Sequence, residues 1–463
     1  MFGARTTLPP GPFYSTPFVA GRELRRDPLG MTVRVWREYG DTTCIRMGPL
    51  RFYMAFHPDD VKHVLQENNQ NYVKGALIAR ARVLVGNGLF SSEGPFWRRQ
   101  RRLMQPAFHR QRLAGFVDTM VACTARALDR WEPHADAGTV FDVADEMNRL
   151  TLTIVGQTLF GRDLSNEAGP AGAALARVLA LTAERVMSYL VWPLWVPTRG
   201  NRELLRTRRV LDEVVLDVIE RRRRGETSGE DLLAMLIEAR DEETGAGMTN
   251  QQLRDEAITF FLAGHETTAV ATSWAWYLLD RHPEVAERLR ADVERVLGDR
   301  LPTLDDMPAL GYARMVIQEA MRLYPPLWGL ARETLGPDRV GGYDVPAGRI
   351  VSLSPYVTHR HPDFWDDPER FDPERFTPER IAARHKFAYL PFGGGPRLCI
   401  GNEFALTEAQ IILAMTVQRY RLRHAGAGPI DLDPSLTLRP RGGVPVRAER
   451  AGRVATGPRR LAG

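Results

Sequence analysis

The sequence predicts a mainly α-helical protein that carries small β-sheets. From about residue 95 to residue 283, apolar residues recur largely with helical period, and turns fall where Gly and Pro cluster. Thr249 and Gln252 have the spacing of a capping box, and the helix that they open continues to residue 281, before a His-Pro pair. At about 1.5 Å per residue that helix is roughly 50 Å long, so it must cross the whole domain. Residues 327–391, by contrast, are rich in turns and short extended runs.

The sequence predicts further strands and helices on both sides of this long helix. Residues 42–47 and 51–56 are predicted as two strands around a Gly-Pro turn, and residues 57–60 open a short helix. A helix over residues 311–324 ends at a Pro-Pro pair, and a last helix over residues 399–419 begins near a cysteine. We find no internal repeat.

Most of the chain is expected to form one domain, over residues 21–447. Residues 1–20 contain no continuous apolar core, so we interpret them as an extended arm and not as a signal peptide. Residues 448–463 are basic and rich in small residues, and we expect a flexible tail. The most apolar stretch, residues 257–279, is interrupted by a His-Glu pair, which argues against a transmembrane anchor.

Composition excludes several classes of protein. The 463 residues are 44% hydrophobic and 26% charged with a net charge of +5, which is ordinary for a globular protein and too small to imply nucleic-acid binding. The cysteines Cys44, Cys123 and Cys399 are too few for a disulfide scaffold or a four-cysteine zinc site. They suit a reducing compartment, so we expect a cytoplasmic protein.

The segment most informative for chemistry is Phe-Gly-Gly-Gly-Pro-Arg-Leu-Cys-Ile-Gly at residues 392–401. A helix start and the adjacent Arg397 favour the thiolate of Cys399, which suits a nucleophile or a metal ligand. No second cysteine lies near enough to support zinc, and Leu398 stands where a dinucleotide-binding fingerprint needs a third glycine. A turn with an incidental cysteine is the alternative.

This segment resembles the haem-binding signature of the cytochrome P450 family. Phe392, Gly395, Arg397, Cys399 and Gly401 fill every fixed position of the pattern. The resemblance implies a helical prism with small sheets, in which haem b lies between the long helix and the cysteine helix. It implies that the Cys399 thiolate is the ligand of the haem iron and that Phe392, Arg397 and Gly401 contact the cofactor. The chain resembles the soluble, stand-alone members of the family.

The Ala-Gly-His-Glu-Thr-Thr segment of the long helix is similar to the oxygen-activation sequence of that family. The resemblance implies that Glu266 and Thr267 are catalytic, as a proton source and a hydroxyl relay, and that Ala263 and Gly264 lie at the haem. Gly264 would let the helix approach a planar cofactor, at a helix-propensity cost of about 1 kcal/mol. A zinc-protease helix is excluded because Ala269 stands where the second His is required. On its own, the segment would more simply be a buried polar patch.

Two further groups of residues match the family. Glu319 and Arg322 share a helix face and, with Arg375, resemble its buried Glu–Arg–Arg arrangement, which has a structural role. Arginine forks and an indole N–H are suitable donors to haem propionates. The resemblance assigns this role to Trp97, Arg101, Arg332 and Arg397. A solvated ion pair and a basic helix face remain open as alternatives for these two groups.

Substrate contacts are the least readable part of the sequence. The resemblance places them at Phe90, Phe260, Ala263, Leu327 and Leu330. These residues are mostly apolar or aromatic, which favours a hydrophobic small molecule, although such residues are by default core. Terpenoid, fatty-acyl and polyketide-like substrates all remain open.

The resemblance implies a monooxygenase that uses O2 as co-substrate for hydroxylation or epoxidation. Electrons from NAD(P)H would arrive through a separate ferredoxin or flavodoxin and its reductase. An acidic partner would suit a basic surface near Cys399, for which a solvated face is an equal alternative. The candidate arginines are Arg98, Arg99, Arg101, Arg102, Arg110 and Arg112. A peroxide-using or peroxide-rearranging haem-thiolate enzyme and a non-enzymatic haem sensor are the competing hypotheses.

Overall fold

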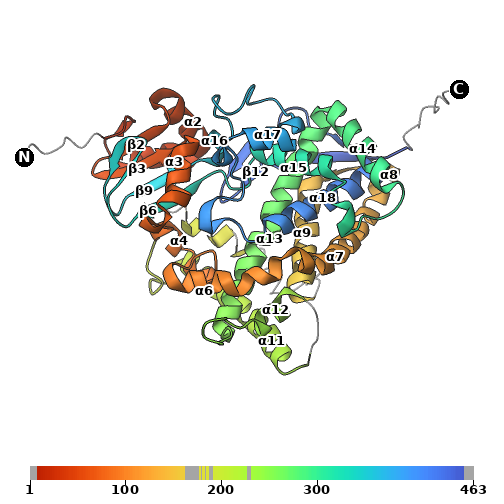
Figure 1. The fold of residues 1–463 in the computed structure, drawn as a ribbon, viewed down its shortest axis with the longest axis horizontal. Coiled ribbons are helices and arrows are strands. Elements are labelled where there is room, and N and C mark those ends of the chain that lie inside the picture. Colours follow the sequence, from red (N-terminus) through yellow and green to blue (C-terminus); the bar gives the residue numbers. More distant parts are fainter. Residues whose placement is uncertain are drawn as a thin grey trace, which may run out of the picture.

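The longest helix, α13 (Asn250–Arg281), runs through the middle of the molecule (Figure 1). The predicted capping box is confirmed, because the Thr249 side chain accepts from the Gln252 N–H and the Gln252 side chain accepts from the Thr249 N–H. The computed structural model describes residues 8–161, 177–178, 180–182, 184–186, 191–226 and 231–452.

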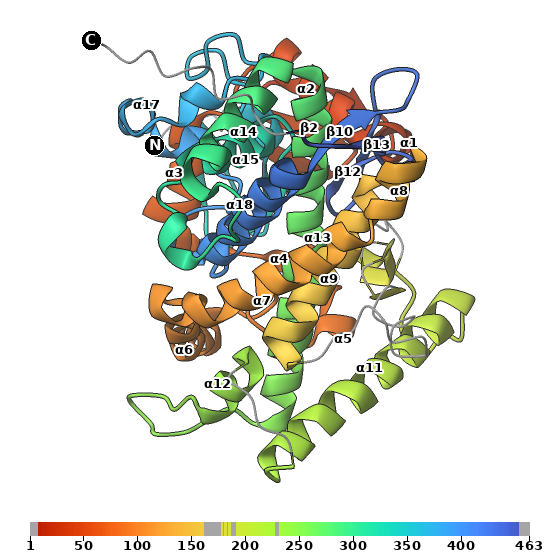
Figure 2. The same cartoon turned by 90° about the vertical axis from the view of Figure 1, so that its right-hand side faces the viewer.

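Other helices cover α13 on several sides, so the buried residues of α13 are not confined to one stripe. Helices α9, α11, α15 and α18 all pack against it, and α11 lies along one edge of the molecule (Figure 2). The bounds of the remaining α-helices are α1 (Pro17–Arg26), α2 (Pro28–Tyr39), α3 (Pro58–Lys62), α4 (Gly75–Ala79), α5 (Arg82–Val85), α6 (Gly94–Met104), α7 (Arg110–Asp129), α8 (Glu132–Ala137), α9 (Val143–Phe160), α11 (Arg199–Arg223), α12 (Leu232–Glu238), α14 (Pro283–Leu297), α15 (Gly311–Leu323), α16 (Pro355–Thr358), α17 (Pro378–Ala383) and α18 (Asn402–Arg419).

Within the described residues, the strands form a six-stranded sheet, a three-stranded sheet and two hairpins. The six-stranded sheet has the order β1-β2-β3-β9-β6-β4, the three-stranded sheet has the order β10-β13-β5, and the hairpins are β7-β8 and β11-β12. The bounds are β1 (Phe13–Tyr14), β2 (Thr42–Met47), β3 (Leu50–Ala55), β4 (Tyr72–Val73), β5 (Val140–Asp142), β6 (Leu330–Thr334), β7 (Asp338–Val340), β8 (Tyr343–Val345), β9 (Ile350–Leu353), β10 (Tyr420–His424), β11 (Leu432–Pro434), β12 (Leu438–Pro440) and β13 (Pro445–Arg450).

The predicted early strand pair is confirmed, with β2 antiparallel to β3 and Thr42 opposite Ala55. β9 then pairs with β3 in parallel and with β6 in antiparallel fashion. The fold class is therefore as predicted: mainly helical, with small sheets, of which the six-stranded one lies at one side of the molecule (Figure 1).

Both ends of the chain differ from the prediction. The arm expected over residues 1–20 is not extended throughout, because β1 pairs with β2 and α1 begins at Pro17. Residues 448–450, expected in a flexible tail, belong to β13 and pair with β10. Residues 1–7 and 453–463 lie outside the described residues.

The largest hydrophobic cluster surrounds α13 and the helices packed on it, and a smaller one lies under the six-stranded sheet. In the part of the chain that the structure describes, no helix combines the length and the apolar character needed to cross a membrane.

Candidate functional site

A glycine-rich loop presents Cys399 just before α18. Gly395 has a φ of 64°, and a Cβ there would lie only 1.9 Å from the carbonyl oxygen of Leu65. No larger residue fits that position without moving the backbone. The N–H of Cys399 donates to the carbonyl of Phe392 at 3.0 Å. Packing and this hydrogen bond together fix the path of the loop.

The thiol of Cys399 is accessible to solvent, unlike the buried Cys44 and Cys123. Surrounding protein atoms nevertheless desolvate it, and this raises the pKa of the thiol. The Gly401 N–H and the Arg101 guanidinium act in the opposite direction and favour the thiolate. The helix start therefore favours the thiolate in the direction expected from the sequence, while desolvation by the surrounding protein opposes it. A metal cation at Sγ would reverse this balance.

Ala263 and Thr267 lie one turn apart on an accessible face of α13. Ala263 is exposed and Thr267 is half-buried, and the Thr267 hydroxyl donates to the Ala263 carbonyl at 2.7 Å. Glu266 is buried and accepts a hydrogen bond from the hydroxyl of Thr437 at 2.8 Å. The acid and the hydroxyl of the predicted relay are therefore neighbours in sequence but have different partners.

Gly264 has a different neighbour from the one predicted. A Cβ at this position would lie 2.7 Å from Cγ2 of Val155 on α9. The glycine lets α13 and α9 pack closely. The predicted place of Gly264 at the haem stays a prediction.

A group of positive side chains gathers around the Glu93 carboxylate. Glu93 accepts from the guanidinium of Arg397 and, at 2.6 Å, from the backbone N–H of Lys74. The Lys74 ammonium donates to the carbonyl of Leu89 at 3.0 Å, and Arg397 lies 4.0 Å from the ring centroid of Trp97. Trp97 and Arg397, predicted as partners of one ligand, are therefore brought together.

Arg332 belongs to the same group but has fewer partners. Its one recorded hydrogen bond within the described residues goes to the carbonyl of Ala331, at 2.8 Å. Desolvation and the charge of Arg397 lower the pKa of Arg332 to about 10, and the same two causes lower the pKa of Lys74 to about 7. This group, Lys74, Arg332 and Arg397 around Glu93, is called the cation cluster below. Its excess positive charge suits a ligand that carries carboxylates.

Sequence reasoning missed Lys74 and Glu93. Neither belongs to a local motif, and the positions that they meet lie hundreds of residues later in the chain. Only the folded topology shows that they approach Arg332 and Arg397.

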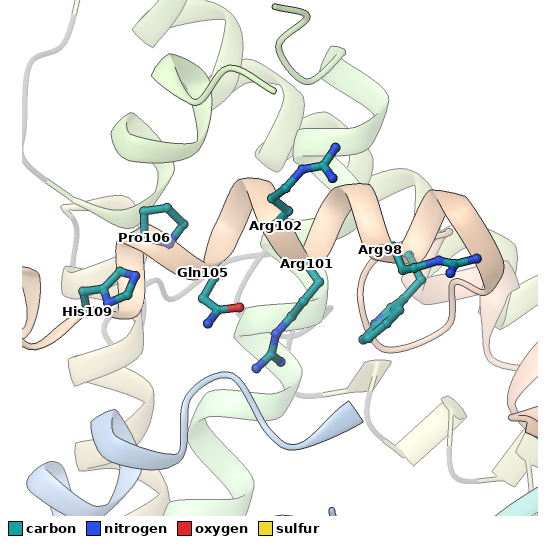
Figure 3. Close-up of a pocket in the computed structure, with 7 residues that line it drawn as sticks. Arg98, Arg101, Arg102, Gln105, Pro106 and His109 are labelled. Carbon is teal, nitrogen blue, oxygen red and sulfur yellow. The ribbon is translucent and has the colours of Figure 1, made fainter. Parts of the chain in front are cut away.

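Arg101 on α6 points toward the cysteine loop (Figure 3) and donates to the carbonyl of Leu398 at 2.8 Å. Arg101 thus contacts the backbone next to Cys399, and its predicted role at a haem propionate stays a prediction. A hollow of about 400 Å³ follows this side of α6 and its continuation. It is lined by Trp97, Arg98, Arg101, Arg102, Gln105, Pro106 and His109.

Not all the predicted basic residues of α6 are free. Arg102 bonds Asp241 at 2.8 Å and Glu243 at 2.7 Å. Arg99 donates to the carbonyl of Ala246 at 3.0 Å. Arg98 is exposed and has no ion pair among the described residues. The side chain of Arg110 lies outside what the structure describes.

The predicted Glu319–Arg322–Arg375 group is assembled and buried. Arg322 makes a two-pronged contact with Glu319, at 2.7 and 2.8 Å. Arg375 Nε lies 3.5 Å from the same carboxylate. Arg322 also donates to the carbonyls of His359, Pro368 and Arg370.

His359, which sequence reasoning missed, connects this group to the cysteine loop. One ring nitrogen lies 3.3 Å from the Arg322 carbonyl, and the other accepts from the N–H of Leu390 at 2.9 Å. Desolvation and Arg322 lower the pKa of His359 to about 3, so the ring is neutral and can accept that bond. Leu390 lies two residues before Phe392, so the Glu–Arg–Arg group supports the start of the loop.

The predicted substrate residues are only partly brought together. Phe260 packs on Phe108 with ring centroids 5.3 Å apart, and Phe108 lies beside Gly401. Phe260 is therefore part of the packing near the cysteine loop. Phe90 is exposed, with the Lys74 ammonium 5.6 Å from its ring centroid. The side chains of Leu327 and Leu330 are half-buried, on the segment that leads into β6.

Residues 9–444 match the family model described as cytochrome P450. The chain belongs to the cytochrome P450 family. It is 36% identical over 432 residues to a cyclooctat-9-en-7-ol 5-monooxygenase of Streptomyces melanosporofaciens, covering 91% of this chain and 92% of that protein. It is 34% identical over 409 residues to a pentalenene oxygenase of Streptomyces avermitilis, covering 87% of each. The crystal structure of a cytochrome P450DA heme domain matches with a TM-score of 0.88 and 29% identity, over 96% of this chain and 98% of that one.

This P450 is an oxidoreductase of the monooxygenase type, and the expectation from the sequence is confirmed at that level. The family works with haem b held by a cysteine thiolate, with O2, and with electrons from NAD(P)H that arrive through redox partners. The residues of this chain fit such a cofactor. Cys399 is accessible in a rigid loop, and the cation cluster lacks the anions that two haem propionates would supply.

Proposed function

We propose that Cys399 is the thiolate ligand of the haem iron and that this P450 oxygenates a hydrophobic small molecule. The observation that carries the assignment is the accessible Cys399 thiol in a glycine-fixed loop before α18, a helix that packs on α13. When bound, the haem would supply oxygen activation, which a thiolate ligand promotes by donating electron density.

The residues of this chain would bind the cofactor and move protons. Arg332, Arg397, Lys74 and the Trp97 indole would hold its carboxylates, because three cations surround the single Glu93 carboxylate and leave excess positive charge at the site. Glu266 would supply protons, and the Thr267 hydroxyl would carry them along the accessible face of α13. Arg101 and the Glu–Arg–Arg group would keep the cysteine loop in place.

We propose a substrate that is mostly hydrocarbon and contains rings. Support comes from the small, exposed Ala263 and the half-buried Leu327 and Leu330, which are predicted substrate contacts. It also comes from relatives whose names specify cyclooctat-9-en-7-ol and pentalenene. Titration of the purified haem protein with these two molecules tests the proposal. Binding is expected to shift the Soret band, and the mutation Ala263→Phe is expected to abolish the shift while leaving the haem content unchanged.

We propose that the electron donor is an acidic ferredoxin or flavodoxin that docks on the exposed arginines beside α6. Arg98 and Arg112 are exposed, and Arg101 links this surface to the backbone next to Cys399. The location that we propose is cytoplasmic, which suits three cysteines that form no disulfide.

The decisive experiment on the ligand is the absorption spectrum of the reduced protein with carbon monoxide. We expect a strongly red-shifted Soret band in the wild type and in Cys123→Ala, and its loss in Cys399→His. Cys123 is a matched control because it is buried, forms no disulfide and lies far from the loop in sequence. An unshifted band in the wild type, or a shifted band that survives in Cys399→His, would show that Cys399 is misassigned.

A further inference from the structure

The turn between β11 and β12 reaches the middle of α13. β12 packs against α13 (Figure 2), and the Thr437 hydroxyl just before β12 donates to Oε1 of Glu266 at 2.8 Å. Thr437 and Glu266 are 2% and 7% exposed, so this hydrogen bond is shielded from competing water. The proposed catalytic acid thus has its strongest contact with a residue 171 positions away in the chain.

Hydrogen bonds on both sides fix the position of this turn. The Leu438 N–H donates to the Pro326 carbonyl at 3.0 Å, and the Trp274 indole donates to the Leu438 carbonyl at 2.7 Å. The Trp328 indole donates to the Ser435 carbonyl at 3.0 Å. The Thr437 hydroxyl is therefore held in place by the backbone around it, and its contact with Glu266 is not that of a mobile loop tip.

Arg439 connects the same carboxylate to the surface. Its Nη1 lies 3.7 Å from Oε1 of Glu266, and its Nη2 lies 3.4 Å from the Asp433 carboxylate. The Arg439 side chain is 48% exposed, whereas that of Glu266 is 10% exposed. The Arg439 guanidinium is thus accessible to solvent and also lies near the buried Glu266 carboxylate.

We propose that Thr437 and Arg439 are positioning residues that hold Glu266 at the inner end of a proton-entry route beginning at the β11–β12 hairpin. This inference rests on the role proposed above for Glu266. Both contacts use Oε1, which leaves Oε2 to exchange a proton. Glu266 passes one proton toward Thr267 and takes one back from solvent near Arg439, so its own charge is restored in each cycle. Arg439 remains protonated throughout and orients the carboxylate without carrying the proton itself.

The test compares Thr437→Val, Thr437→Ser and Arg439→Gln with Glu266→Gln. NADPH-driven O2 consumption is measured without added substrate, with a surrogate ferredoxin and reductase. Reduction of O2 to peroxide consumes two electrons and two protons, and reduction to water consumes four of each. The ratio of peroxide to water therefore reports proton supply. We expect the ratio to rise about tenfold in Thr437→Val, the size of a lost hydrogen bond to a charged group, and to stay near the wild-type value in Thr437→Ser.

The chain offers a matched control for Arg439. Arg423 is 43% exposed and lies 3.7 Å from the Glu449 carboxylate, but it does not contact Glu266. We expect Arg439→Gln to raise both the peroxide ratio and the solvent deuterium isotope effect on NADPH oxidation, and Arg423→Gln to change neither. The carbon monoxide spectrum must be the same in all variants, which excludes a general loss of haem binding.

A second measurement does not depend on turnover. The infrared carboxylate band of Glu266, assigned by its loss in Glu266→Gln, is expected to shift in Thr437→Val and to stay unshifted in Arg423→Gln. If Glu266→Gln leaves the peroxide ratio unchanged, the proposed role of Glu266 itself fails. If Glu266→Gln raises the ratio but Thr437→Val and Arg439→Gln do not, and the band does not shift, only this further inference is overturned.

Discussion

Two arginines of similar chemistry, Arg322 and Arg332, have opposite surroundings. Arg322 uses all five of its N–H donors, two toward Glu319 and three toward backbone carbonyls. Arg332 has one recorded hydrogen bond in the part of the chain that the structure describes, to the carbonyl of Ala331. The pKa of Arg332 is lowered to about 10 by desolvation and by Arg397.

This difference distinguishes a charged side chain that stabilises the fold from one that can bind a ligand. A buried ion that is fully bonded within the chain has nothing left to offer a ligand, and its loss harms the fold. A desolvated ion with unused donors gains from an added anion. Arg322 therefore supports the cysteine loop, whereas we propose that Arg332 and the cation cluster bind the carboxylates of the haem.

The largest effect is expected when the satisfied group is broken. Arg322→Met should lower the free energy of unfolding by about 3–5 kcal/mol, because Glu319 is left buried without its partner. Urea denaturation followed by tryptophan fluorescence measures this change. Arg421, which is 39% exposed and pairs with Glu287 at 2.8 Å, is the control, and Arg421→Met should cost less than about 1 kcal/mol. Equal losses in the two variants would mean that burial of the pair does not matter.

The next largest effect is expected at Arg332, and it concerns the rate of haem release instead of the free energy of unfolding. Arg332→Met should speed haem release roughly ten- to a hundredfold, because it removes charge-assisted hydrogen bonds to the cofactor, and should change the urea midpoint far less than Arg322→Met. Haem transfer to an excess of an acceptor protein measures release. Arg339→Met is the control, since Arg339 is exposed and bonds the Gly342 carbonyl. Normal haem release with a large loss of stability would place Arg332 with the structural ions.

The two groups also differ in how far the sequence reveals them. Glu319 and Arg322 lie three residues apart on one helix, so their pairing follows from helical geometry. The capping box at Thr249 and the glycines before Cys399 are equally local, and both are found as predicted in the structure.

Long-range contacts were not predictable in the same way. The cation cluster joins residues 74, 93, 332 and 397, and no periodicity relates them. Gly264 meets Val155 because α9 crosses α13 at that point, and Arg101 meets Leu398 because α6 lies beside the cysteine loop. Such contacts depend on the crossing of elements, which a single sequence does not show.

Glu256 extends the comparison of buried charged residues to a carboxylate. It is a buried carboxylate that accepts from the Leu89 N–H at 2.8 Å and the Gln100 amide at 3.2 Å. Burial raises the pKa of Glu256 from 4.5 to about 7. A raised pKa means that the folded state holds a proton that the unfolded state has lost. The stabilisation from this proton is therefore complete below pH 4.5 and is lost as the pH rises to about 7.

Glu256→Gln should remove this pH dependence, which is about 3 kcal/mol for a pKa raised from 4.5 to about 7. Urea unfolding at a series of pH values between 4.5 and 7 measures it, with Glu287→Gln on the surface as the control. A wild-type stability that is flat over this range would show that the Glu256 carboxylate is ionised in the folded protein.

The smallest effect is expected on the surface, where Arg102 has two ion pairs and Arg98 has none among the residues that the structure describes. Arg98→Glu should slow reduction by an acidic ferredoxin about two- to fivefold at low salt, because an unpaired exposed charge acts on the approach of a partner. Arg102→Glu should instead lower the stability of the fold, because the new carboxylate would face Asp241 and Glu243.

Stopped-flow reduction at several salt concentrations separates the two effects, since the effect of Arg98→Glu should vanish as salt screens the charge. Equal slowing by both variants at every salt concentration would assign the effect to a disturbed α6, and it would remove the support for docking on this surface.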